Sequence, residues 1–219
     1  MQKRKKKFSK KNHIFRMVIL SCFLLIFLGS CFGMSMDITM YAEGSGKIVL
    51  EYRVSKALEA LGRLDGNQKW PSIPVGKADF ERSISRMTDL KLLSLTEKND
   101  LSDLVTSVEL EFNNPQALIT FLNGSGSSAS LSAENGLNRL LLALWEAPAE
   151  PVNADLLSLL QEISAGYRFS FSFTAPKAAS LRTSVNIDET VTNGKKVSFQ
   201  ADTGSILTHN NSLILEISW

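Results

Sequence analysis

Hydrophobic and polar residues alternate with a period of two along several stretches of the chain, and this pattern predicts β-strands. One alternating run covers residues 37–42 and a second covers residues 47–54, with Gly44-Ser45-Gly46 between them. Two such runs around a short glycine-rich turn predict a β-hairpin. Further strands are predicted at residues 90–97, 104–112, 167–174 and 212–219, with another hairpin over 185–201 around Asn193-Gly194.

Other segments have the 3.6-residue period of helices. Residues 113–123 begin with an Asn cap and Pro115 and carry an apolar face of Leu118, Phe121 and Leu122. Residues 153–166 carry a stripe of Leu156, Leu159, Leu160 and Ile163 and end at Gly166. Shorter helices are predicted at residues 55–61 and after a cap at Asp79, where Phe80, Ile84 and Met87 share one face.

Three segments lie between these elements. Residues 62–76 contain three glycines and two prolines and predict a surface loop, and "GSGSSAS" at residues 124–130 predicts a flexible one. The run "NRLLLALWEAP" at 138–148 fits either a buried strand or a helix, and a strand is favoured. The pattern as a whole predicts an α+β fold, with a mostly antiparallel sheet of hairpins and three to four amphipathic helices packed on it.

Charge is divided unevenly along the chain. Residues 1–30 contain eight of the 24 Lys and Arg and no acidic residue. The remainder holds 16 basic residues against all 22 acidic ones, a net charge of −6. An acidic body argues against general binding of nucleic acid, so we expect no nucleic-acid partner.

The basic residues belong to a leader with the order of a signal peptide. Residues 1–16 form a basic n-region, and residues 17–28 form an uncharged h-region of twelve residues. "LGSC" follows, and this resembles the lipobox of bacterial lipoproteins: aliphatic Leu28, small Gly29 and Ser30, then Cys31. The resemblance implies cleavage between Ser30 and Cys31 and attachment of diacylglycerol to the Cys31 thiol, with palmitate among the acyl chains.

Two alternatives remain open at the leader. A plain secretory signal could be cut nearby, or the 18-residue apolar run from Met17 to Met34 could stay as an uncleaved anchor. Cys22 offers a second box, "ILSC", but with only a short apolar stretch before it and bulky Leu20 at the second position before the cysteine. The favoured division is a signal peptide over 1–30, a lipidated tether over 31–36 and an extracytoplasmic domain over 37–219. This domain is either one unit or two halves that meet near residues 123–132.

Residues suited to catalysis are sparse in the body. Cys22 and Cys31 are the only cysteines, and His209 is the only histidine after the leader. The sequence contains no G-x-S-x-G elbow and no P-loop pattern, and carboxylate pairs such as Glu109 and Glu111 share the polar face of a predicted strand. We therefore expect no enzyme activity, no cofactor and no metal site.

Four aromatic residues share one face of the strand at 167–174: Tyr167, Phe169, Phe171 and Phe173. Such a stripe is most simply part of the core. Its alternative role is to line a groove for acyl chains or another apolar ligand.

The start of the body gives a second resemblance. The lipobox cysteine, followed by "DITMYAEGSGKIVLEYRVS", mixed helices and hairpins and a β-rich end, resembles the LppM-like group of bacterial envelope lipoproteins. This resemblance implies an α+β extracytoplasmic domain and contact with lipid or glycolipid.

Together these features predict a lipoprotein of the bacterial cell membrane, held by the lipid on Cys31, with the choice between inner and outer membrane open. The predicted role is a non-catalytic binding or scaffold module that contacts envelope proteins or lipids. The alternative is a carrier of lipid or a small apolar ligand with an internal cavity.

Overall fold

The computed structural model describes residues 32–56, 77–124, 128–147, 154, 158, 161–162, 164–185, 189–209 and 211–219. Eleven strands lie in these ranges. They are β1 (Phe32–Met40), β2 (Gly46–Ser55), β3 (Leu90–Asn99), β4 (Asp103–Phe112), β5 (Ser128–Glu134), β6 (Leu137–Trp145), β7 (Arg168–Thr174), β8 (Ser180–Thr183), β9 (Glu189–Asn193), β10 (Lys196–Asp202) and β11 (Leu213–Ser218). The helices with described bounds are α3 (Lys77–Ile84), α4 (Pro115–Gly124) and α6 (Thr203–Leu207).

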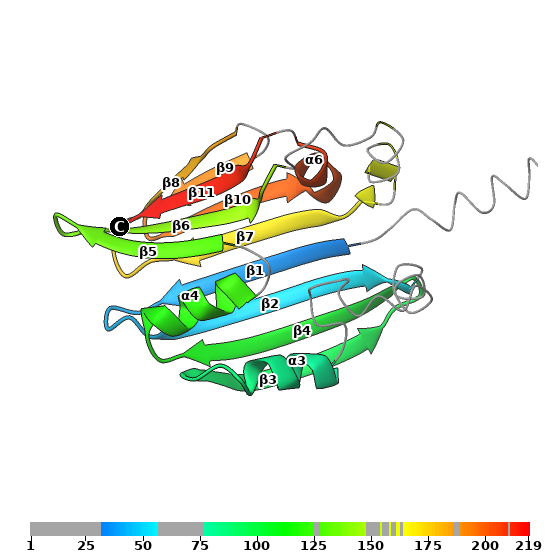
Figure 1. The fold of residues 1–219 in the computed structure, drawn as a ribbon, viewed down its shortest axis with the longest axis horizontal. Coiled ribbons are helices and arrows are strands. Elements are labelled where there is room, and N and C mark those ends of the chain that lie inside the picture. The colour runs from blue at the N-terminus through cyan, green and yellow to red at the C-terminus, as the bar shows by residue number, and fades with distance from the viewer. Residues whose placement is uncertain are drawn as a thin grey trace, which may run out of the picture.

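The strands form two sheets (Figure 1). The larger sheet has seven strands in the order β3-β4-β2-β1-β7-β10-β9, and the smaller has four in the order β5-β6-β11-β8. Among the described strands, every pairing is antiparallel except that of β1 with β7, which is parallel. The first described strand, β1, therefore lies in the middle of the larger sheet.

Alternation of side chains gives the larger sheet one apolar face. Ile48, Leu50 and Tyr52 of β2 are buried, whereas Val49 and Glu51 between them are not. The same alternation holds in β1, β4, β7 and β10, and their inward apolar side chains join a single core cluster.

Two different layers cover this apolar face. Figure 1 shows α3 and α4 in front of the strands from β1 to β3, and the smaller sheet in front of β7, β10 and β9. Leu118 and Leu122 of α4 are fully buried, and so are Leu140 of β6 and Leu215 of β11.

The predicted α+β class is wrong, because the chain is mostly β. A second sheet, rather than additional helices, covers half of the larger sheet. Only three short helices have bounds in the described ranges, and α6 has just five residues. Ala154, Ser158, Gln161, Glu162 and Ser164 are also helical, but the predicted stripe of leucines in that segment lies outside the described residues.

The strand β5 accounts for part of this error. The segment at 124–130 was predicted to be a flexible loop, yet residues from Ser128 onward pair with β6. Asn135 and Gly136 make the connecting turn with positive φ values of 53° and 79°, as a two-residue hairpin requires. The preference for a strand over residues 138–148 is confirmed by β6.

Several other elements match their predictions. The hairpins β1–β2 and β9–β10 form as expected, and Gly44 and Gly194 adopt positive φ in their turns. In α4 the Asn114 side chain accepts a hydrogen bond of 2.9 Å from the Ala117 amide, as predicted for its cap. Helix α3 instead begins at Lys77, so Asp79 lies inside the helix and not at the predicted position before it.

The division of the chain into leader, tether and domain stays a prediction. Residues 1–31, which include the signal peptide and Cys31, lie outside the described residues. Residues 32–36, assigned to the tether, are the first residues of β1. The larger sheet contains strands from both sides of residues 123–132. None of the helices in the described ranges is long and apolar enough to cross a membrane.

Candidate functional site

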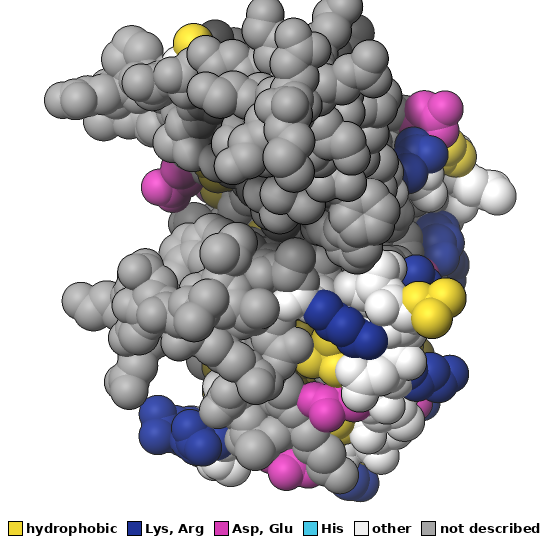
Figure 2. Space-filling model, turned by 90° about the vertical axis from the view of Figure 1, so that its right-hand side faces the viewer, with side chains coloured by type: hydrophobic (Ala, Val, Ile, Leu, Met, Phe, Trp, Pro, Cys, Tyr) yellow, Lys and Arg dark blue, Asp and Glu magenta, His cyan; other side chains and the backbone are white. Residues whose placement is uncertain are grey.

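The second face of the larger sheet is polar, and we call it the open face. Its outward residues include Ser35, Asp37, Thr39, Lys47, Val49, Glu51, Arg53, Ser107, Glu109, Glu111, Arg168, Ser170, Ser172, Lys196, Ser198 and Asp202. Figure 2 shows the end of the molecule at which β1 begins, where Lys and Arg side chains are dispersed among uncharged ones on the described surface. Charges of both signs and many hydroxyl groups are thus presented together.

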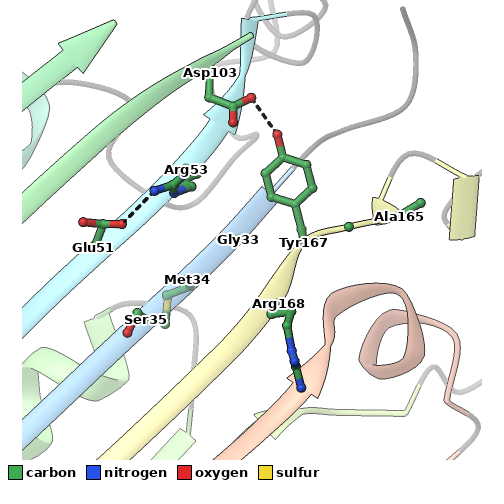
Figure 3. A pocket seen from close by; sticks show the side chains of 10 residues that line it. Gly33, Met34, Ser35, Glu51, Arg53, Asp103, Ala165, Tyr167 and Arg168 are labelled. Carbon is green, nitrogen blue, oxygen red and sulfur yellow. Dashed lines mark hydrogen bonds and ion pairs between the residues drawn. The ribbon is translucent and has the colours of Figure 1, made fainter. Parts of the chain in front are cut away.

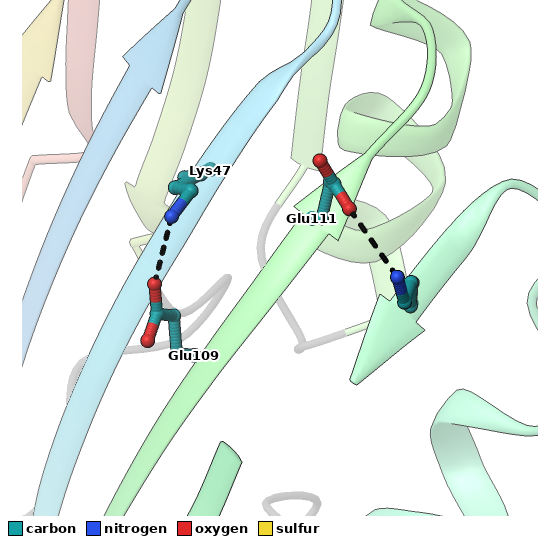
Figure 4. Close-up of polar contacts among 4 residues, drawn as sticks. Lys47, Glu109 and Glu111 are labelled. Carbon is teal, nitrogen blue, oxygen red and sulfur yellow. Dashed lines mark hydrogen bonds and ion pairs between the residues drawn. The ribbon is translucent and has the colours of Figure 1, made fainter. Parts of the chain in front are cut away.

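Away from that end, the charges on the open face are paired across strands. Lys47 Nζ lies 3.1 Å from Glu109 Oε1, and Lys91 Nζ lies 4.0 Å from Glu111 Oε2 (Figure 4). Lys196 Nζ lies 2.7 Å from Asp37 Oδ2. The hydrogen bond from Lys47 to Glu109 raises the pKa of Lys47 above its usual value. These cations therefore already have carboxylate partners.

A pocket of about 470 Å³ opens on this face, close to where β1 begins (Figure 3). Its polar lining comes from Ser35 of β1, Glu51 and Arg53 of β2, Asp103 of β4 and Arg168 of β7. The pocket is bounded on its other side by the turn at residues 165–166, in which Gly166 has a φ of +84°. It is a polar hollow with charges of both signs.

The Tyr167 side chain extends across neighbouring strands of the larger sheet at this pocket. Its hydroxyl donates a hydrogen bond of 2.6 Å to Asp103 Oδ1, and both residues are buried. Tyr167 directly precedes β7, whereas Asp103 begins β4, so the ring passes over β1 and β2 (Figure 3). A Cβ at Gly33 would lie 3.0 Å from Tyr167 Cδ1. Glycine at this position therefore lets the ring lie against the β1 backbone.

Two arginines stand on either side of β1 in the same row. Arg53 pairs with Gly33 across β2 and β1. The parallel register of Met34 with Phe169, continued by one residue, brings Gly33 beside Arg168. Because neighbouring strands lie about 4.8 Å apart, the two arginine backbones are separated by roughly 10 Å. The Tyr167 ring lies over Gly33, the residue between them.

The structure positions the aromatic stripe of the sequence analysis in the core. Phe169, Phe171 and Phe173 are buried, and Phe173 lies 5.1 Å from Trp219 between ring centroids. Only Tyr167 of the stripe lines the pocket. Its other predicted role, a ligand-binding face, stays a prediction.

The remaining predicted site residues are those of the lipobox and its cleavage point. Leu28, Gly29, Ser30 and Cys31 lie outside the described residues. The first described residue is Phe32, and Gly33 of the pocket follows it. Cys31 is therefore two residues away from the pocket along the chain.

Sequence reasoning missed Arg53, Arg168 and Asp103. Arg53 and Arg168 occupy polar positions of predicted strands, and Asp103 directly precedes the strand predicted at 104–112. Such positions by themselves predict only solvation. Their proximity depends on the parallel pairing of β1 with β7, between segments far apart in the chain. The charge pattern of the individual strands gives no signal for that pairing.

The chemistry of the pocket suits binding of polar groups. Guanidinium groups offer several hydrogen-bond donors, and the hydroxyl of Ser35 adds a donor and acceptor. His209 lies elsewhere, in a turn where its Nδ1 accepts a hydrogen bond of 3.1 Å from the Asn211 amide. In the described ranges no three Asp, Glu, His or Cys side chains are grouped closely enough to hold a metal ion.

Of the comparisons with known proteins, the one with solved structures gives a match. No protein-family model and no curated protein sequence matches this chain. Among solved structures, the NMR structure of the folded domain of LppM from Mycobacterium tuberculosis matches over 86% of this chain and 90% of that one. The two chains are 14% identical, and the TM-score is 0.49. The lipobox and membership of the LppM-like group stay predictions.

Proposed function

We propose that this chain is a lipid-anchored lipoprotein of the bacterial cell envelope that binds a polar, charged partner or ligand in the pocket on its open face. The observation that carries the proposal is the position of the pocket relative to the anchor. Gly33 lines the pocket, and two residues of extended chain span about 7 Å at most. A lipid on Cys31 would therefore hold the pocket next to the membrane surface.

The anchor part of the proposal is supported by the leader. A basic n-region, a twelve-residue apolar core and a lipobox occur in the order that lipidation needs. Each buried methylene group contributes about 0.8 kcal/mol, so the two or three acyl chains of a lipidated cysteine hold a protein firmly. Extracytoplasmic location follows from the same leader.

The binding part is supported by the contrast between the two faces of the larger sheet. The apolar face is packed against helices and the smaller sheet, whereas the open face presents a hollow with charged groups. A binding role needs no nucleophile or general base, and the body supplies neither cysteine nor more than one histidine. We therefore propose recognition without catalysis.

Substituting the lipobox cysteine tests the anchor. In Cys31→Ser we expect loss of incorporated palmitate and retention of the leader, because serine has no thiol to accept diacylglycerol. Intact-mass measurement of membrane-extracted protein, with radiolabelled palmitate, reports both changes. Cys22→Ser is the matched control and should be processed like the unsubstituted chain. Unchanged mass and membrane partition of Cys31→Ser would show that the anchor is wrongly assigned.

Site-specific crosslinking tests the pocket. A photo-crosslinking amino acid at Ser35 should form adducts with an envelope component in membranes, because Ser35 lines the pocket. The same group at Thr39 lies on the same strand and the same face but outside the lining, and it should form few. Mass spectrometry of the adducts compares the two positions. Equal yields at Ser35 and Thr39, or none at either, would contradict binding at this pocket.

A further inference from the structure

The turn between β3 and β4 presents an apolar side chain to solvent. Leu101 is 98% exposed, more than any other large apolar residue in the described ranges. A single exposed leucine is common on protein surfaces and needs no explanation by itself. What gives this one a role is its place in the molecule, at the tip of a hairpin beside the start of β1.

Hydrogen bonds hold the turn in place and leave the leucine pointing outward. The Asp100 amide donates a hydrogen bond of 2.9 Å to the Asp103 carbonyl oxygen, and the Leu101 amide donates one of 2.7 Å to Asp100 Oδ1. Lys56, which directly follows β2, donates to the same turn. Its amide lies 3.0 Å from the Ser102 carbonyl oxygen, and its Nζ lies 2.5 Å from the Asp100 carbonyl oxygen.

The register of the larger sheet places this turn at the end where β1 begins (Figure 1). Phe32 of β1 is level with Val54 of β2, which is level with Leu104 of β4. Leu101 lies two positions beyond that row, so it extends about 7 Å past the level of Phe32 at about 3.3 Å per residue. Cys31 is only one residue from Phe32, and one residue spans at most about 3.6 Å. The leucine therefore reaches at least as far in this direction as the attachment point of the proposed lipid.

We propose that Leu101 inserts into the lipid bilayer and forms a second membrane contact beside the lipid on Cys31. The inference deepens the proposed function and rests on its anchor, which brings this end of the sheet to the membrane. A lipid holds the protein at one point and leaves it able to tilt. Because β4 is two strands from β1, the second contact lies about 10 Å to the side. Two contacts at this spacing restrict the tilt, and so the direction in which the pocket opens.

The charges beside the leucine are of both signs, which favours the bilayer itself as the partner over a particular headgroup. Lys56 and Lys98 lie near the turn with Glu97 and Asp100, and all four are exposed. Lysine side chains can lay their methylene groups along an apolar surface and keep the amine in the headgroup region. We therefore expect insertion into uncharged phosphatidylcholine as well as into anionic lipid.

A fluorescent amino acid at Ser102 tests the contact in the full lipidated chain. Ser102 is exposed and follows Leu101, so the leucine itself is kept. The protein is reconstituted in phosphatidylcholine vesicles, with or without phosphatidylcholine that carries a nitroxide near the top of an acyl chain. Since interfacial apolar side chains are buried about 5–10 Å into the headgroup and acyl boundary, we expect the nitroxide to quench this label about twofold or more.

The matched position for the label is Glu134. It is exposed and lies in the hairpin between β5 and β6, at the opposite end of the molecule (Figure 1). The lipid nitroxide should leave a label there nearly unquenched. Equal quenching at Ser102 and Glu134 would overturn the inference.

Two variants separate the leucine from the rest of the turn. Leu101→Asp should reduce quenching at Ser102 about twofold, because a carboxylate is costly to move out of water. Leu137 is an exposed leucine beside the turn between β5 and β6, so Leu137→Asp should leave quenching at Ser102 unchanged. Unchanged thermal unfolding is the folding control for both exposed positions. Undiminished quenching in Leu101→Asp would overturn the inference.

A protein partner for the leucine would give a different result. The Ser102 label would then be protected from aqueous iodide in native membranes but would not be quenched by nitroxide in vesicles of pure lipid. That outcome would also overturn the inference, because the vesicles contain no protein other than this chain.

Intact-mass measurement of the same samples reports the anchor separately. If the chain carries its lipid and stays on the vesicles while the Ser102 label is unquenched, the contact of Leu101 is wrong and the anchored binding module stands. If the mass shows no lipid but Leu101-dependent quenching persists, the anchor assignment fails and the contact stands.

Discussion

Phe173→Ala should destabilise the fold by about 3–5 kcal/mol, the usual cost of removing a buried aromatic side chain. Phe173 has no exposed surface, and it lies on β7 in the larger sheet. Its ring faces Trp219, the residue that follows β11 of the smaller sheet, at a centroid separation of 5.1 Å. The substitution therefore leaves a cavity where the two sheets meet. Since the free energy of unfolding of an ordinary domain is about 5–15 kcal/mol, this loss is a large fraction of the total stability.

Urea unfolding followed by tryptophan fluorescence measures this loss. Val191→Ala is the matched control, because Val191 lies on β9 with 56% of its surface exposed and should change stability by less than about 0.5 kcal/mol. Phe173→Leu keeps most of the apolar volume and should fall between the two. If Phe173→Ala unfolded at the same urea concentration as Val191→Ala, the conclusion that the two sheets pack against each other through this ring would be wrong.

The strands of the larger sheet were largely predictable because their residues alternate strictly. In β2 and β7, apolar residues at every second position point into one core, and the polar residues between them form the open face. Short-range hairpins were also predictable where a turn requires residues with positive φ, as at Gly44 and Gly194. Local pattern and local turn chemistry agree in these elements.

The smaller sheet was harder to predict because β5 and β6 lack this pattern, although β11 has it. The seven residues of β5 are mostly small and polar, and only Ala129 among them is buried. A strand of this kind is held by pairing with β6 and not by a hydrophobic face of its own. The sequence therefore favoured a loop here, and helices packed on one sheet were expected where the structure has a second sheet.

The site depended on a contact between distant segments. The parallel pairing of β1 with β7 places Arg168 beside Gly33, and the Tyr167 ring then reaches Asp103 across two strands. No short motif contains these residues. The leader, in contrast, is a contiguous pattern of charge, apolar length and small residues, which is why the anchor could be predicted from the sequence and the pocket could not.

Gly46→Ala should destabilise the fold by about 3 kcal/mol or more, because the added methyl group has no space. Gly46 begins β2, directly opposite Met40 of β1 and Phe112 of β4. A Cβ there would overlap the Thr39 carbonyl oxygen and the Phe112 ring. One of these neighbours is backbone in the middle of the larger sheet, so relief requires a shift of the strand itself.

The matched control separates this overlap from the conformational preference of glycine. Gly136 has a φ of +79° and nothing within 4 Å of the position of its Cβ, so Gly136→Ala should cost only about 1–2 kcal/mol of left-handed strain. Equilibrium unfolding in urea compares the two variants under identical conditions. The Gly44-Ser45-Gly46 turn predicts a hairpin on its own, but the need for glycine at its last position comes from three strands meeting there. If Gly46→Ala destabilised the fold no more than Gly136→Ala, the conclusion that β1, β2 and β4 approach closely at this point would be wrong.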